Sequence, residues 1–241
     1  MEVHAHSHTP RKKWTHYFWE FLMLFLAVFC GFMAENIREH GIERKRTIRY
    51  ARQFITEIEM DTSLFNEGIS FVNGKTNAVD SLIQGLNEEN WKEIYFWGLH
   101  IDQYYVAKFH SASFEQIKYA GYLRNFENEE LVNAIQDYIN FRDNVEIVQN
   151  ELATFYNQQV TPFINRNLDK QYLGKGNVRK RSFFDSLWTR KPMLIHTVNQ
   201  IEFRNILITI RDSYYLGFLY KTLHERSIAL ISLIKKEFDL K

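Results

Sequence analysis

The segment Tyr17–Ala34 reads YFWEFLMLFLAVFCGFMA, and Glu20 is its only charged residue. As an α-helix this segment would rise by about 27 Å, which is close to the roughly 30 Å thickness of the hydrocarbon core of a bilayer. Its length and composition therefore predict a membrane-spanning helix, which we place at residues 14–34 because the flanking aromatic residues belong to it.

The flanks of this segment favour a membrane span over a buried core helix. The cationic run Arg11–Lys13 precedes it, and Trp14, Tyr17 and Trp19 lie where aromatic rings prefer the headgroup layer. A cleaved signal peptide also begins with basic residues and an apolar run, but no A-x-A-like cleavage site closes this one. We therefore expect the helix to be retained as an anchor.

Glu20 lies about one turn inside the amino-terminal edge of the apolar segment, where a carboxylate is costly unless it reaches water, is protonated or has a partner. Steps of four and three residues from Glu20 follow one helix face through small residues, which let transmembrane helices approach closely. His16 lies one turn earlier on the same side and can hydrogen-bond to Glu20. The candidate intramembrane functional or helix-contact residues are Glu20, His16, Ala27, Gly31 and Ala34.

Three roles stay open for Glu20. Its carboxylate can snorkel to water and set the depth of the helix, or it can contact a partner helix. An intramembrane carboxylate can also carry a proton or an ion. The small-residue stripe favours self-association or a partner membrane protein, with membrane lipid as the surrounding medium.

The orientation of the predicted span is indicated in two opposite ways. The tail before it carries three Lys and Arg residues and residues 35–52 carry six, which favours a cytoplasmic carboxyl side. A first apolar helix behind a clustered basic tail, however, ordinarily behaves as an uncleaved signal anchor. We expect the second arrangement, with the bulk of the chain on the periplasmic side of a bacterial cytoplasmic membrane.

Residues 1–13 form a polar tail that contains three alternating histidines, His4, His6 and His8. Alternating histidines can chelate a divalent metal ion, but neither cysteine nor a conventional ligand spacing accompanies them. We therefore expect a solvated tail, and we predict no metal and no cofactor for the chain.

The composition favours an all-α protein. The 241 residues include 10 Gly and 3 Pro, with 16% aromatic and 24% charged residues, which suits long helices, a filled core and little loop. The single Cys, Cys30, lies in the predicted span, so no disulfide is expected. A net charge of +1 gives no global attraction to nucleic acid. We predict one membrane helix that continues into a long-helix bundle over residues 35–241.

Apolar residues keep the helical periodicity beyond the predicted span. They recur at alternating steps of four and three, a heptad spacing that lasts about five repeats. This seam suits an intermolecular coiled coil or a face packed on later helices of the same chain, and we expect the latter. Gly74 and Asn77 predict a weak break at its end. The seam comprises Ile37, Gly41, Arg44, Ile48, Ala51, Ile55, Ile58, Thr62, Phe65, Ile69 and Val72.

Residues 79–109 combine a helical face with a crowd of aromatic side chains. The aromatic cluster can stack on a ligand, but aromatic residues at helical spacing more often fill a core, and we expect the core here. The helical face consists of Val79, Leu82, Ile83 and Leu86, and the aromatic residues include Trp91, Tyr95, Phe96, Trp97, Tyr104 and Tyr105.

Residues 111–141 read SASFEQIKYAGYLRNFENEELVNAIQDYINF. Ser113 with Gln116 predicts a capping box, and Gly121 predicts a left-handed helix end. Asn128 is expected to begin the next helix, because Glu129 and Glu130 follow it where carboxylates favour a helix amino terminus.

The F-E-Q-I-K-x-x-G-x-L-R-x-F-x-N-x-E-L pattern in this stretch resembles that of uncharacterised membrane-anchored helical proteins of Bacteroidetes-type bacteria. These proteins similarly begin with one apolar helix, run into a charged helix and finish in a long helix near an L-I-K-K-E pattern, which is Leu233–Glu237 here. The resemblance covers most of the chain. It implies a single-pass all-helical protein and transfers no activity and no functional residue.

The sequence from residue 131 onward predicts two helical stretches around a basic loop. The first covers residues 131–160 and is expected to stop at Pro162. Residues 165–192 are expected to form a solvated loop, since no nucleic-acid-binding module accompanies its cations. A helix from Thr197 to Phe238 follows, which Gly217 is expected to bend without ending. The cations of the loop are Lys175, Arg179, Lys180, Arg181, Arg190 and Lys191.

No enzyme motif is found in the sequence. It contains neither a phosphate-binding G-x-x-x-x-G-K-S/T loop nor G-x-S-x-G, H-E-x-x-H or a paired-Cys motif, so we expect no enzymatic activity. The carboxylates Glu57, Glu59 and Asp61 cluster near the heptad seam. A metal site there would need residues from several helices, and we expect a solvated face instead.

These patterns support two functional hypotheses. The first is a single-pass helical scaffold or interaction protein that self-associates and holds a helical bundle against the membrane. The second rests on the YFWEFLMLFLAVF segment, which is similar to the anchor helices of ion-driven motor and energiser subunits, whose acidic residue carries the coupling ion. Glu20 would be its counterpart, although Glu replaces the usual Asp and its spacing from Tyr17 is shifted by one.

Overall fold

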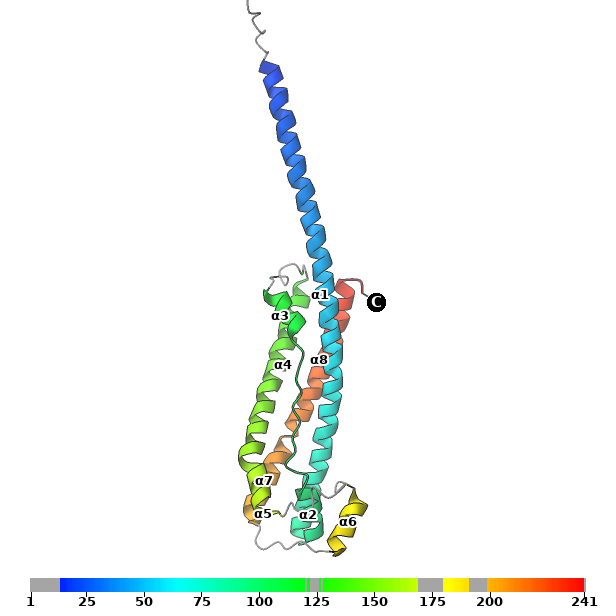
Figure 1. Cartoon of the computed structure of the whole chain (residues 1–241), viewed down its shortest axis with the longest axis vertical. Coiled ribbons are helices and arrows are strands. Elements are labelled where there is room, and N and C mark those ends of the chain that lie inside the picture. The colour runs from blue at the N-terminus through cyan, green and yellow to red at the C-terminus, as the bar shows by residue number, and fades with distance from the viewer. Residues whose placement is uncertain are drawn as a thin grey trace, which may run out of the picture. The chain divides into compact units, whose positions relative to one another are not determined.

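Every regular element of the described residues is a helix, which confirms the predicted all-α class (Figure 1). The computed structural model describes residues 14–119, 121, 126, 128–168, 180–190 and 199–240, so the predicted histidine tail lies outside the described part. The elements are α1 (Trp14–Asn87), α2 (Trp91–Gly98), α3 (Ala112–Tyr119), α4 (Glu129–Phe155), a π-helical turn η2 (Tyr156–Val160), α5 (Thr161–Asn167), α6 (Arg181–Arg190), α7 (Gln200–Asp212) and α8 (Tyr215–Glu237).

Helix α1 runs through both units into which the chain divides. The first unit is Met1–Tyr50 and the second is Ala51–Lys241. The break predicted at Gly74 and Asn77 was wrong, because α1 is continuous to Asn87. One glycine in a helix costs about 1 kcal/mol, and the burial of Val72 and Ala78 on either side of Gly74 offsets that cost.

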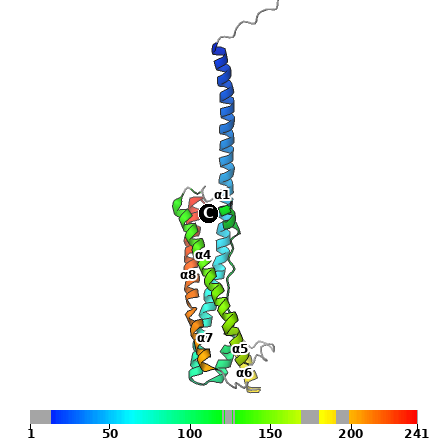
Figure 2. The same ribbon diagram turned by 90° about the vertical axis from the view of Figure 1, so that its left-hand side faces the viewer.

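Within the second unit the heptad seam packs on the chain's own helices. Ala51, Ile55 and Ile58 are buried, as are Phe65 and Val72 further along α1. The cyan part of α1, α4 and α8 lie side by side along the bundle (Figures 1 and 2). The predicted face of Val79, Leu82, Ile83 and Leu86 also faces the core, with Ile83 partly buried.

Two glycines let α8 approach α1 closely. A Cβ built on Gly217 of α8 would lie 3.1 Å from Cγ1 of Val72, and one built on Gly68 of α1 would lie 2.6 Å from Cε2 of Tyr220. The Tyr220 ring is fully buried and its hydroxyl donates to Oε1 of Gln149 on α4 at 2.8 Å. Gly68 therefore supplies the space that this fixed ring occupies.

Residues 103–111 form an extended segment that runs along the bundle without helix or strand pairing (Figure 1). Buried backbone groups need hydrogen-bond partners, and side chains of the flanking helices supply them here. Ala107 N donates to Oε1 of Gln149 at 2.6 Å, and the Tyr105 hydroxyl donates to the Leu64 carbonyl at 3.0 Å. The prediction that the aromatic residues of this region fill the core is confirmed in part, because Tyr95 and Phe96 of α2 are buried while Tyr104 of the extended segment is exposed.

The predicted helix ends around residues 111–131 are correct at two positions and wrong at one. Asn128 caps α4 by accepting from Leu131 N at 3.3 Å, and Gly121 has φ of 71° after α3. Ser113, however, lies inside α3, and its hydroxyl donates to Glu57 of α1 instead of capping its own helix. A carboxylate at a helix amino terminus does the same work from another element.

Pro162 does not end a helix. The helix that begins at Glu129 changes into the π-helical turn at Tyr156 and continues as α5, with Pro162 in the first turn of α5. A proline inside a helix lacks an amide for the ladder of hydrogen bonds and crowds the preceding turn, and the π-helical turn directly before Pro162, in which Thr161 N donates to the Tyr156 carbonyl, is where that ladder changes. The prediction of a stop at Pro162 was therefore wrong.

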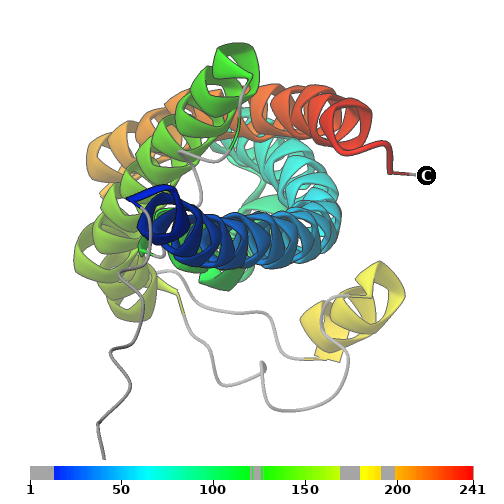
Figure 3. The ribbon, with the colours of Figure 1, turned by 90° about the horizontal axis from the view of Figure 1, so that it is seen from above.

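The predicted loop and the last predicted helix also need correction. Residues 165–192 include the end of α5 and the ten-residue α6, which contacts α2 and lies at the margin of the bundle (Figure 3). Lys175, Arg179 and Lys191 lie outside the described residues. The long helix expected from Thr197 to Phe238 is two helices, α7 and α8, which are divided at Ser213 and Tyr214 before the glycine expected to bend it.

Candidate functional site

The apolar side chains of the predicted membrane segment of α1 are exposed and do not pack against the rest of the described chain. The helix is long and apolar enough to cross a membrane by length and composition, and no part of its most apolar 18-residue window is buried. The exposed side chains include Phe21, Leu24, Phe25, Val28 and Phe32. An exposed apolar surface of this extent marks a contact with lipid or protein.

His16 and Glu20 stand together at the start of this segment. Nε2 of His16 lies 3.1 Å from Oε1 of Glu20, and the two side chains are 46% and 53% exposed. The arrangement is that of an i, i+4 pair on one helix face. It brings two titratable groups to one point of an otherwise apolar surface.

Ala27, Gly31 and Ala34 are all exposed on α1. A Cβ built on Gly31 would meet nothing within 4 Å, so the space beside this glycine is open. Small residues with open space allow the backbone of a second helix to come close. The contact with a partner helix stays a prediction.

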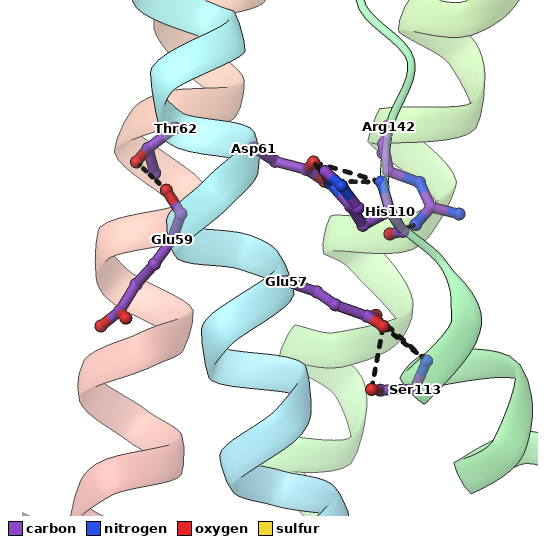
Figure 4. Close-up of polar contacts among 7 residues, drawn as sticks. All are labelled: Glu57, Glu59, Asp61, Thr62, His110, Ser113 and Arg142. Carbon is purple, nitrogen blue, oxygen red and sulfur yellow. Dashed lines mark hydrogen bonds and ion pairs between the residues drawn. The ribbon is translucent and has the colours of Figure 1, made fainter.

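A second group of polar residues lies inside the bundle, where the extended segment crosses α1 and α4 (Figure 4). The Asp61 side chain is only 2% exposed. Its carboxylate accepts from the His110 backbone N at 3.1 and 3.2 Å and lies 2.6 Å from Nδ1 of the His110 ring. Arg142 of α4 donates from Nη1 to the His110 carbonyl at 3.2 Å. The backbone N–H and the backbone carbonyl of His110 therefore each have a side-chain partner.

The charges of this cluster act on one another through a poorly solvated space. Burial raises the pKa of Asp61 above its ordinary value, while hydrogen bonds from His110 and the nearby Arg142 oppose that shift. Burial also raises the pKa of Tyr138 to about 12, so its hydroxyl stays protonated. The cluster is therefore a buried hydrogen-bonded network that holds the extended segment.

Glu57 continues the same pattern one turn away (Figure 4). Its carboxylate accepts from Ser113 N at 2.9 and 3.1 Å and from the Ser113 hydroxyl at 2.9 Å. Glu59, between Glu57 and Asp61 in sequence, points away and lies 3.8 Å from Nζ of Lys235. The expected solvated face is thus correct for Glu59 and wrong for Asp61.

A metal ion is not suggested by these carboxylates. Among the described residues, no group of three or more His, Cys, Asp and Glu side chains is arranged to hold one. The oxygens of Asp61 and Glu57 instead face backbone amides at helix α3 and the segment before it. These carboxylates therefore act as hydrogen-bond acceptors that hold main-chain amides in place.

Sequence reasoning missed His110 and Arg142 as parts of this cluster. Each lies more than thirty residues from a partner, since the Asp61–His110 pair spans 49 positions and the Arg142–His110 pair spans 32. No local pattern reports such pairs. One sequence signal could have indicated the cluster. Arg142 stands at helical spacing between Tyr138 and Val145, on a face whose other residues are apolar and buried.

Arg181, which the sequence places in a basic loop, makes ion pairs and a ring contact with other residues of the chain. It forms an ion pair with Glu93 and another with Asp185 at 3.0 Å, and its guanidinium lies 4.8 Å from the centre of the Phe96 ring. These contacts hold α6 against α2.

Comparison with known proteins adds no relative. No protein-family model, no curated protein and no solved structure matches the chain.

Proposed function

We propose that the protein is a membrane-anchored helical scaffold that self-associates, or binds a partner membrane protein, through the first part of α1. The observation that carries this proposal is the exposed apolar surface of residues 17–34 on a helix that later enters a packed bundle. An exposed apolar surface of that kind is unfavourable in water. Lipid can cover it without any change in the packing of the bundle. The anchor and the first helix of the folded unit are then parts of one continuous helix, α1.

Alkaline carbonate extraction of membranes that contain the full chain tests the anchor. We expect the protein to stay in the membrane pellet, and we expect the double variant Leu24→Lys, Leu26→Lys to move to the supernatant. Each lysine at the centre of a span costs about 3 kcal/mol on insertion. The matched control, Ile37→Lys with Ile42→Lys, places the same charges further along α1 and should stay in the pellet. Release of the unmodified protein by carbonate would refute the anchor.

Gly31→Leu tests self-association through the small-residue face. A leucine there fills the open space beside the glycine, so we expect the dimer in detergent to weaken about tenfold, which corresponds to roughly 1.4 kcal/mol. Met33→Leu, which lies well away from this face, should leave the association unchanged. Sedimentation equilibrium in a density-matched detergent measures both. A monomeric wild-type protein would remove self-association and leave the partner-protein form of the proposal.

A second candidate function is ion coupling through Glu20, as in the anchor helices of energiser subunits. The pairing of Glu20 with His16 at 3.1 Å on an apolar helix favours it, since an acidic residue in a membrane span often marks an ion pathway. Glu20→Gln keeps the shape and removes the charge. If ion-driven activity in cells is unchanged while the assembly persists, this candidate is refuted; if the assembly is lost, Glu20 acts in helix contact.

A further inference from the structure

Helix α8 packs on the bundle with one face and leaves the opposite face exposed. On the exposed face, Phe218 and Ile228 are 57% and 56% exposed, and Lys221 and Glu225 between them are exposed as well. These four residues follow one another at steps of three, four and three, so they share one side of the helix, which we call the outer face of α8. The buried residues of α8 are Leu216, Leu219, Tyr220, Leu223, Ser227, Leu230 and Ile234.

The amino-terminal end of the outer face belongs to an exposed aromatic patch. Tyr214 and Tyr215 are each 56% exposed, and the Tyr215 ring is stacked on that of Phe218 with 6.1 Å between the ring centres. A hollow of about 640 Å³, open to solvent, lies beside these rings and is also lined by Thr76 of α1 and Arg211 of α7. Aromatic residues and arginine are enriched where proteins contact one another. The patch therefore has the composition of a surface for a protein partner.

The outer face is symmetric in sequence about Leu223. Lys221 and Glu225 stand two positions on either side of it, and Phe218 and Ile228 stand five positions on either side. When a second copy of α8 lies antiparallel with the two Leu223 positions at the same level, Lys221 faces Glu225 of the second copy. Phe218 then faces Ile228 of the second copy. A two-fold axis makes each of these pairs occur twice.

Charge decides the direction and the register of such a pair. A parallel pair would place Lys221 beside Lys221 of the second copy and Glu225 beside Glu225, and like charges repel. An antiparallel pair shifted by one heptad places Lys221 opposite Phe218 in one direction and Glu225 opposite Ile228 in the other. A charge covered by an apolar side chain loses hydration without gaining a partner. The register centred on Leu223 thus pairs charge with opposite charge and apolar with apolar.

We propose that a second copy of this chain docks antiparallel on the outer face of α8. Two ion pairs between Lys221 and Glu225 form its centre, and two contacts between Phe218 and Ile228 flank them. Ile228 of the second copy then lies against the Phe218 ring, next to the hollow. The second copy meets the self-complementary charges and the apolar ends of the face at once, which a partner of single charge cannot do.

This contact goes beyond the proposed function, because it uses no residue of the membrane segment. The second half of α1 and α8 lie side by side along the bundle (Figures 1 and 2). The antiparallel pairing therefore places the Ala51 ends of the two bundles at opposite ends of the pair. It is separate from a contact between membrane segments at Gly31.

Charge reversal in the full chain in detergent tests the central ion pairs. Lys221→Glu and Glu225→Lys each turn two attractions into two repulsions, so we expect each to weaken the association about tenfold. The double variant Lys221→Glu, Glu225→Lys should associate like wild type, and so should an equal mixture of the two single variants. Sedimentation equilibrium measures all of them. Lys108→Glu makes the same charge change at an exposed position outside α8 and should have no effect.

Two results of this experiment would overturn the proposal. Single variants that associate like wild type would show that these charges do not meet across an interface. A double variant that stays as weak as the single ones would show that net charge alone matters. The same variants in a Gly31→Leu background keep the test apart from the membrane segment, since the effect of Lys221→Glu should be unchanged there even where the contact at Gly31 is lost.

The apolar ends of the interface have a matched control on α7. Phe218→Ala should weaken the association at least tenfold, because a buried aromatic contact is lost twice. Ile201→Ala removes a side chain that is 74% exposed but lies on another helix, and it should leave the association unchanged. Equal effects of the two substitutions would refute docking on the outer face.

Disulfide trapping tests the direction of the pair. Chains that carry Cys30→Ser with Phe218→Cys are mixed with chains that carry Cys30→Ser with Ile228→Cys, and a mild oxidant is added. In the antiparallel pair position 218 meets position 228, whereas two copies of position 228 are about 15 Å apart along the helices. We expect cross-linked dimers in the mixture and none with either chain alone. Cross-linking of either chain with itself, or none in the mixture, would contradict the antiparallel pair.

Discussion

Asp61 and Glu59 stand two positions apart on α1 and have opposite surroundings. The Asp61 side chain is 2% exposed and holds the main chain at His110, while the Glu59 side chain is 54% exposed and has one long ion pair to Lys235. The residues are close in sequence and similar in chemistry. Their roles differ because one helix face meets the extended segment and the other meets water.

Asp61→Ala should destabilise the bundle by about 3 kcal/mol. The substitution leaves the His110 amide without its acceptor and removes the charge of Asp61 from near Arg142, which keeps its ion pair with Asp143. Glu59→Ala is the matched control and should change the free energy of unfolding by less than about 0.5 kcal/mol. Urea unfolding followed by circular dichroism measures both. Similar losses of stability in the two variants would contradict the proposed role of the Asp61 carboxylate in holding the main chain at His110.

Burial lowers the pKa of the Lys75 ammonium group to about 8, which predicts a pH dependence of stability. Between pH 8 and about 10.4 the unfolded chain binds more protons at this residue than the folded chain, so stability rises with pH in this window. Relative to Lys75→Met, the wild-type protein should gain up to roughly 3 kcal/mol from pH 8 to pH 10.4. Lys221→Met, at an exposed position of α8, should run parallel to wild type. A constant difference between wild type and Lys75→Met would show that the amine is not a weak base.

At the scale of elements, two of the glycines of α1 have opposite surroundings. Gly68 faces the fixed ring of Tyr220, whereas a Cβ built on Gly74 would meet nothing within 4 Å. Both stand in the interior of one helix, where alanine is the better helix former by about 1 kcal/mol. Packing therefore decides which glycine is needed.

Gly68→Ala should destabilise the protein by about 1–3 kcal/mol, because the added methyl group overpacks the contact with Tyr220. Gly74→Ala should instead stabilise it by up to about 1 kcal/mol. Thermal unfolding of the two variants distinguishes the cases. A stabilised Gly68→Ala variant would mean that α8 shifts away from α1 without loss.

The same scale explains why some helix boundaries were predictable. Asn128 caps α4 with its own side chain, and such a cap is visible in a few consecutive residues. The start of α3 is capped by Glu57, which lies 56 positions before Ser113, so the local Ser113–Gln116 pattern was misleading. The π-helical turn before Pro162 was likewise not predicted from the local sequence.

At the scale of the whole molecule, the chain combines a helix with exposed apolar side chains and a unit with its own core. Residues 35–46 of α1 are all exposed and lie between the apolar segment and the part of α1 whose side chains are buried. In lipid vesicles we expect the amides of residues 35–46 to exchange hydrogen faster than those of residues 17–34 and of residues 51–87. Mass spectrometry of peptic peptides measures this. Equal exchange of residues 17–34 and 35–46 in vesicles would contradict the membrane span.

The sequence by itself determined the all-α class, the apolar segment with its lone Glu20, and the buried face of α1 from Ala51 to Leu86. These features depend on periodicity and composition, which are local. Only the tertiary structure decided that Asp61 is buried, that residues 103–111 are extended and that Lys75 donates to the His100 carbonyl. Each of these depends on partners between 25 and 49 positions away, and the burial of a polar group is set by what packs against it from elsewhere in the chain.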